Sequence, residues 1–105
     1  MTKDEKIKAL QRVIGHPNRG SVYYKLFEDM GDLKFDYCNY MTTKPVDCDL
    51  ELERLPLADY ELCSALFTML LREDYFSTGA LKRRYEAGQV DDILVRMVEK
   101  LKEEG

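Results

Sequence analysis

Residues 45–56, PVDCDLELERLP, alternate acidic and apolar side chains. Because successive side chains of a β-strand point to opposite faces, a strand here carries its carboxylates on one face and its apolar groups on the other. Carboxylates two residues apart on a strand are separated by about 6.6 Å, so all four cannot coordinate one metal ion. We interpret the acidic face, with two aromatic neighbours, as a surface that docks a basic protein partner. The residues of this predicted docking surface are Asp47, Asp49, Glu51, Glu53, Tyr37 and Tyr40.

Two other interpretations of the acidic face stay open. The first is a solvated strand edge, whose charges prevent pairing with the edge of another sheet. The second is a metal site that some of these carboxylates share with Asp36.

Arg72 and Asp74 form a second polar group that could do chemistry. Together with Asp36 they could serve a small metal-assisted hydrolase or transferase, since a positioned carboxylate can transfer a proton. A structural explanation competes, because an arginine at a helix end offsets the helix dipole and an aspartate caps the turn that follows. An enzyme needs these groups together in one pocket, whereas a docking surface spreads its charges over an exposed face.

Signals of catalysis are few. The only histidine, His16, lies in a GHPN turn, where simple surface exposure explains it, and the motifs GxSxG, GxxxxGK[ST] and GxGxxG do not occur. Cys38, Cys48 and Cys63 lack the CxxC spacing of a zinc site, so we expect free structural thiols. We therefore predict no catalytic residue, no metal and no cofactor, and we favour a binding or regulatory module over an enzyme.

The composition indicates a folded protein of one domain, residues 1–105, with 45% hydrophobic and 34% charged residues. No apolar run approaches the roughly 18 residues of a membrane span, and the charged first residues do not resemble a signal peptide, so we expect a cytoplasmic protein without membrane contact. Residues 28–61 hold ten acids and three bases, a net charge of −7, which would repel a phosphate backbone. Nucleic acid is therefore disfavoured as a partner.

Helical periodicity dominates the chain, and the fold class we predict is mainly α (α+β). Thr2 and Glu5 fit a capping box that begins a helix over 3–14. The segment 58–73 is apolar around most of its circumference, so we place it as a central, buried helix. About five helices surround or include this centre, and the segments expected to form them are 3–14, 20–30, 58–73, 79–87 and the residues from 89 onward.

Between residues 33 and 53 the apolar pattern changes to a period of two. With 42–45 as a loop, Met41 faces Val46 and Tyr37 faces Leu50 on one side, which predicts a small β-hairpin over 33–53. The last helix carries a wide apolar stripe over 90–101, so a homodimer is an alternative to the basic protein partner.

The segment LREDYFSTGALKRRYEAGQVDDILVRMVEKL resembles the C-terminal part of a family of small bacterial and archaeal proteins catalogued as a domain of unknown function. The family signature reads R-x-D-x-F-x-x-G-x-L, followed by an aromatic residue, a glycine and an apolar helix. The earlier KFDYCNY is similar to a Phe-Asp-Trp-x-x-Trp stretch of that family, with tyrosines in place of both tryptophans.

The resemblance implies no activity, but it points to Arg72, Asp74, Phe76 and Gly79 as the residues to test for a site. The same residues also fit a hinge after the central helix, with Phe76 filling the core and Gly79 allowing a close approach. The signature alone does not separate these two explanations.

Overall fold

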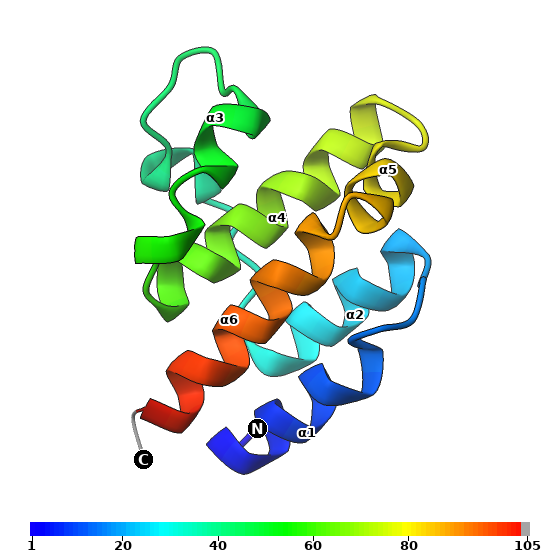
Figure 1. Cartoon of the computed structure of the whole chain (residues 1–105), viewed down its shortest axis with the longest axis vertical. Coiled ribbons are helices and arrows are strands. Elements are labelled where there is room, and N and C mark those ends of the chain that lie inside the picture. Colours follow the sequence, from blue (N-terminus) through cyan, green and yellow to red (C-terminus); the bar gives the residue numbers. More distant parts are fainter. Residues whose placement is uncertain (104–105) are drawn as a thin grey trace.

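Helix α4 (Tyr60–Phe76) forms the centre of the fold in the computed structural model, which describes residues 1–103 (Figure 1). The side chain of Asp59 begins this helix by accepting a hydrogen bond from the backbone N–H of Leu62 at 2.8 Å. Every residue from Cys63 to Leu70 is buried. The prediction of a central buried helix is confirmed, and the helix continues beyond the expected end at residue 73.

Five further α-helices pack around or beside α4 within residues 1–103, and no strand occurs there. They are α1 (Lys3–Val13), α2 (Gly20–Met30), α3 (Cys48–Leu52), α5 (Ala80–Glu86) and α6 (Gln89–Glu103), joined by the short 3-10 helices η1 (Tyr37–Tyr40) and η2 (Leu55–Leu57). The predicted capping box of Thr2 and Glu5 is present at the start of α1. None of the helices in this part of the chain combines the length and apolarity that a membrane crossing requires.

The core is organised around Phe67, on the buried middle of α4. Its ring stacks on the ring of Phe27 from α2, with centres 4.5 Å apart, and meets the edge of Tyr23 at 5.3 Å. Such aromatic pairs stabilise a core beyond the area they bury. These two ring contacts fix α2 against α4.

The apolar stripe of α6 is covered within the chain. Its residues pack against α4 and α1, and those that are buried are Val90, Ile93, Leu94, Met97, Val98 and Leu101. The stripe is therefore not available to a second copy. The expectation that residues 90–101 present an uncovered apolar stripe to a second copy is wrong, because α1 and α4 cover it (Figure 1). A homodimer through another surface stays a prediction.

The predicted β-hairpin over 33–53 is also wrong. Residues 48–52 form α3 instead, and the Asp47 side chain caps it by accepting from the backbone N–H of Leu50 at 3.1 Å. Cys48 and Leu52, four residues apart, lie on one side of the helix and pack against the core. Leu50, which a strand would bury with them, is 51% exposed.

Candidate functional site

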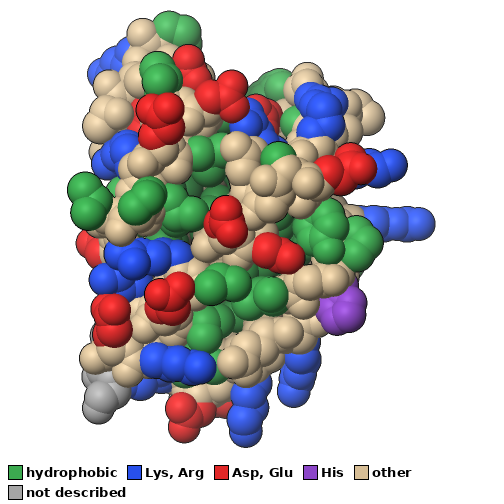
Figure 2. Space-filling view, in the orientation of Figure 1, with side chains coloured by type: hydrophobic (Ala, Val, Ile, Leu, Met, Phe, Trp, Pro, Cys, Tyr) green, Lys and Arg blue, Asp and Glu red, His purple; other side chains and the backbone are tan. Residues whose placement is uncertain are grey.

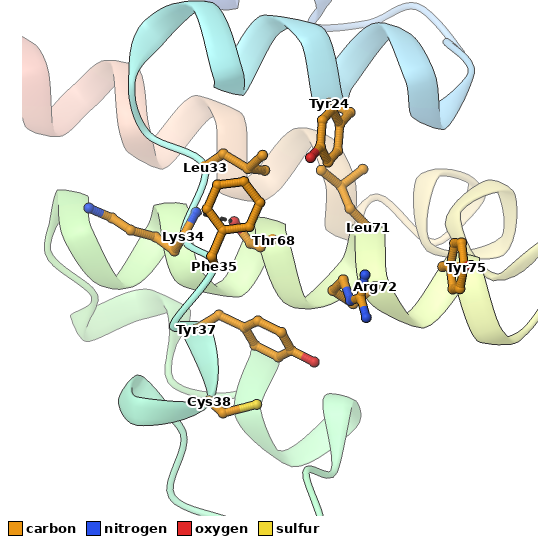
Figure 3. Close-up of a pocket in the computed structure, with 10 residues that line it drawn as sticks. All are labelled: Tyr24, Leu33, Lys34, Phe35, Tyr37, Cys38, Thr68, Leu71, Arg72 and Tyr75. Carbon is orange, nitrogen blue, oxygen red and sulfur yellow. Dashed lines mark hydrogen bonds between the residues drawn. The ribbon is translucent and has the colours of Figure 1, made fainter.

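A cleft of about 470 Å³ opens between α2, residues 33–38 and the C-terminal half of α4 (Figure 3). Four of its ten lining residues are aromatic, namely Tyr24, Phe35, Tyr37 and Tyr75. Figure 3 shows Arg72 between Tyr37 and Tyr75 on the α4 side. We call this feature the Arg72 cleft.

Polar contacts fix the segment 33–38 in place over α4. At its start, the buried carboxylate of Asp32 accepts a hydrogen bond from the Tyr60 hydroxyl and pairs with Lys6 at 3.1 Å. One residue into the segment, the backbone N–H of Lys34 donates to the Thr68 hydroxyl at 3.1 Å. These contacts join the segment to α1 and α4, so the wall of the cleft is held by buried groups.

Within residues 1–103, Arg72 lies in the cleft without an acidic partner. Its guanidinium carbon is 5.3 Å from the ring centres of both Tyr75 and Phe76, which follow it at the i+3 and i+4 positions of α4. A cation over an aromatic face gains about 0.5–1 kcal/mol at an exposed site. Among the ion pairs of residues 1–103, none involves Arg72.

The charge of the cleft is opposite in sign to that of the chain. The chain has a net charge of −4, yet the cleft lining contains two bases, Lys34 and Arg72, and no acid. Lys34 forms an ion pair with Glu61. Although burial alone would lower the pKa of Lys34, this carboxylate raises it. The lysine therefore stays protonated, and Glu61 balances its charge. The guanidinium of Arg72 is therefore the unbalanced charge of the cleft.

Glu51, predicted to lie on the docking surface, is 0% exposed. Its carboxylate accepts hydrogen bonds from the backbone N–H groups and hydroxyls of Thr42 and Thr43, and it pairs with Arg54 at 2.8 Å. Burial alone would raise the pKa of Glu51, but these contacts outweigh it and lower the pKa to about 2. Glu51 organises the loop before α3, and the prediction that it meets a partner is wrong.

The other three acids of the predicted surface stay exposed, in different roles. Asp47 caps α3, Asp49 pairs with Arg84, and Glu53 makes no side-chain hydrogen bond or ion pair within the described residues. Figure 2 shows acidic side chains grouped over the α3 region, with basic side chains beside them. Docking of a basic partner therefore stays a prediction for Asp47, Asp49 and Glu53 alone.

The two tyrosines of the predicted surface lie in different surroundings. Tyr37 lines the Arg72 cleft, and burial raises the pKa of its hydroxyl. Tyr40 is half-buried, and its backbone carbonyl accepts a hydrogen bond from Arg54 at 2.8 Å. Only Tyr37 therefore belongs to the cleft.

The residues of the R-x-D-x-F-x-x-G-x-L signature divide into two groups. Asp74 accepts a hydrogen bond from the backbone N–H of Leu81 at 3.0 Å, and so caps α5 from outside. Gly79, at the N-cap of α5, has a φ of +88°, which favours glycine. Arg72 and Phe76 are exposed. The expectation that Phe76 fills the core is wrong, because its side chain is 75% exposed beside Arg72.

Asp36, Arg72 and Asp74 do not line one cavity. Arg72 faces the cleft, whereas an oxygen of Asp74 lies 3.5 Å from the position of a Cβ on Gly20, at the start of α2. Asp36 is exposed at the N-cap of η1 and makes no capping hydrogen bond. Within the described chain, no three His, Cys, Asp or Glu side chains are grouped so that they could hold a metal ion.

Two of the three thiols are poorly suited to act as nucleophiles. Burial raises the pKa of Cys48 to about 11, with a contribution from the Glu73 carboxylate, and raises that of Cys63 to about 12. A thiol with such a pKa is protonated at neutral pH, and the thiolate is the reactive form. The expectation of free thiols is met, since Cys38, Cys48 and Cys63 form no disulfide.

Three aromatic residues of the cleft were not predicted from the sequence as site residues, namely Tyr24, Phe35 and Tyr75. For Tyr75 a signal exists in the sequence, because helical spacing places it and Phe76 next to Arg72. Tyr24 and Phe35 reach the cleft only through the packing of α2 and of residues 33–38 on α4 (Figure 3). No local pattern predicts that packing.

The architecture is thus that of a small helical domain with an aromatic cleft around one arginine. The chain belongs to the family described as "Family of unknown function (DUF6508)", whose model matches residues 3–103. This confirms, at the level of the family, the resemblance noted in the sequence. No curated protein and no solved structure matches the chain significantly.

Proposed function

We propose that this protein is a binding module whose Arg72 cleft holds an aromatic or apolar group that carries a carboxylate. The observation behind the proposal is the Arg72 guanidinium, which lies on two aromatic rings and has no acidic partner within residues 1–103. An arginine presents a planar fork of donors that matches a carboxylate. One unbalanced positive charge suits a ligand group with one negative charge.

The walls of the cleft support the apolar part of this ligand. Tyr24, Phe35, Tyr37 and Tyr75 offer ring faces and edges to a planar or aliphatic group, and Leu33 and Leu71 extend the apolar surface. Sites for small ligands and peptide side chains commonly combine such apolar walls with a few polar groups that fix orientation. Phe35 is 80% exposed, which leaves its ring available to cover a bound group.

Binding agrees with the arrangement of the polar groups better than catalysis does. The hydrolase or transferase alternative requires Asp36, Arg72 and Asp74 to converge, and Asp74 instead caps α5 on another side of α4. The thiols of Cys48 and Cys63 are kept protonated by their surroundings, and neither of them lines the Arg72 cleft. No specific contact favours the enzymatic alternative.

The absence of tryptophan from the chain permits a direct test. N-acetyltryptophan carries a carboxylate and N-acetyltryptophanamide does not, and the fluorescence of either probe can be followed without a protein tryptophan signal. We expect the anionic probe to bind about fivefold more tightly, the effect of a charge-assisted contact of about 1 kcal/mol at a partly exposed site.

Two variants make the test specific. Arg72→Gln should remove the preference for the anionic probe, whereas Arg83→Gln, which changes an exposed arginine of α5 outside the cleft, should retain it. Equal affinity for both probes in the unmodified protein, or an unchanged preference in Arg72→Gln, would refute the proposal.

A further inference from the structure

A second cavity of about 380 Å³ adjoins the Arg72 cleft and shares Arg72 and Tyr37 with it. These two side chains form a ridge, with one cavity on each side. We call the second one the Phe76 cavity, after the exposed ring at its edge. A single small group in the Arg72 cleft would leave the Phe76 cavity empty.

The Phe76 cavity is suited to an apolar side chain. Val46, Met69 and Phe76 contribute apolar surface to it. Its two acids, Asp49 and Glu73, are both bound by Arg84, which also lines the cavity. These three residues together carry a net charge of −1, and each of them is in an ion pair. Arg72 is the one charged residue lining the two cavities that forms no ion pair within residues 1–103.

We infer that the natural occupant is an extended acidic segment of a protein partner, which places one apolar side chain in each cavity and a carboxylate on Arg72 between them. This inference rests on the proposed function. Charge complementarity argues for the acidic segment, because Arg72, on the ridge between the cavities, forms no ion pair within residues 1–103, while the other charged lining residues do. The exposed rings of Phe35, Tyr75 and Phe76 beside an arginine have the composition of a protein-binding hot spot.

The order apolar, acidic, apolar along one side suits an extended peptide. Side chains at alternate positions of such a peptide point in one direction, about 6.6 Å apart. The probe we choose is therefore acetyl-Trp-Ser-Glu-Ser-Leu-amide, in which tryptophan, glutamate and leucine share a side. Its matched control is acetyl-Trp-Ser-Glu-Ser-Ser-amide, which lacks only the group meant for the Phe76 cavity.

We expect the leucine peptide to bind about tenfold more tightly than its control, the gain from burying most of a leucine side chain. Phe76→Ser should abolish this gain, so that the two peptides bind the variant with equal affinity. Both peptides carry the same tryptophan and glutamate, so their comparison does not depend on any effect that loss of the Phe76 ring has on Arg72. Because Phe76 is 75% exposed, the variant is expected to fold, which circular dichroism will check.

The possible results separate the two proposals. Binding of N-acetyltryptophan through Arg72 without a gain from leucine would overturn the inference, favour a small-molecule ligand and leave the proposed function standing. A leucine gain that persists in Phe76→Ser would place that side chain elsewhere and also overturn it. Self-association that N-acetyltryptophan competes away would assign the cavities to a second copy of this chain. If no probe binds, both proposals fail together.

Discussion

Arg72 and Arg84 line the same cavity from neighbouring helices, yet only Arg84 is paired with acids. Arg84 binds Glu73 through two nitrogens, at 3.0 and 2.8 Å, and also binds Asp49. Arg72 contacts aromatic rings and forms no ion pair within the described residues. Arg84 therefore ties α3, α4 and α5 together, whereas Arg72 is the arginine that we propose to bind a ligand.

This difference predicts that the same substitution affects stability at one arginine and not at the other. Arg84→Gln should lower the free energy of unfolding by about 1–3 kcal/mol, because it leaves the half-buried Glu73 without its bidentate partner. Arg72→Gln should change it by less than about 0.5 kcal/mol, as is usual for exposed side chains. Urea denaturation of both variants measures this, and equal losses would show that Arg72 also holds the fold.

Glu51 and Glu53 offer a matched pair of substitutions that tests the predicted docking surface. Glu51→Gln should lower the free energy of unfolding at neutral pH by about 3 kcal/mol, the equivalent of its pKa shift from 4.5 to about 2. Glu53→Gln, on an exposed side chain without a partner in the described chain, should have little effect. If both glutamates lay on one docking face, the two substitutions would cost the same.

The effect of Glu51 should also depend on pH in a defined direction. Because its folded pKa is lowered, the ionised carboxylate stabilises the fold fully above pH 4.5, and this stabilisation is lost as the pH falls toward 2. The difference in stability between the unmodified protein and Glu51→Gln should therefore shrink over that interval. A difference that stays constant from neutral pH to pH 2 would mean that the charge of Glu51 is irrelevant.

Asp74 should contribute to stability and not to binding. Asp74→Ala removes the carboxylate that accepts from the Leu81 N–H and should cost about 1 kcal/mol, the usual value of a helix cap. The affinity for N-acetyltryptophan should be retained. Asp36→Ala, at an exposed position without such a contact, is the control. Loss of probe binding in a folded Asp74→Ala protein would show that Asp74 contributes to the binding site.

Two glycines near Asp74 should respond differently to alanine. Gly79→Ala places a side chain at a φ of +88° and should destabilise the protein by about 1 kcal/mol. Gly20→Ala should be neutral or slightly stabilising, because its new Cβ would make ordinary contacts of 3.5 and 3.7 Å at the start of α2. Thermal unfolding of both variants tests this contrast, and equal shifts would contradict it.

The sequence predicts the longer helices of the fold, but it does not predict the structure of the segment before α4. Residues 46–52 alternate as a strand would, but Cys48 and Leu52 also have the spacing of one helical face, so the short apolar pattern fits both structures. The choice is made by contacts outside the pattern, above all the burial of Glu51 against Thr42 and Thr43. Binary patterning treats Glu51 as a solvent-facing acid, and so it predicts the wrong face.

The cleft was predictable only in part. Arg72 and Phe76 were identified from the family signature, and helical spacing adds Tyr75. The remaining walls, from Tyr24, Phe35 and Tyr37, depend on how α2 and residues 33–38 pack across α4 (Figure 3). Tertiary packing of this kind leaves no periodic trace in the sequence.

The most direct test of the central proposal is to observe the Arg72 side chain itself. In a nitrogen-15 correlation spectrum, the Nε–H signal of Arg72 can be identified by its loss in Arg72→Lys and then followed during a titration with N-acetyltryptophan. We predict a saturable shift of this signal, and a much smaller one with N-acetyltryptophanamide. An Arg72 signal that does not move, or that moves equally with both probes, would contradict a carboxylate-binding role for the cleft.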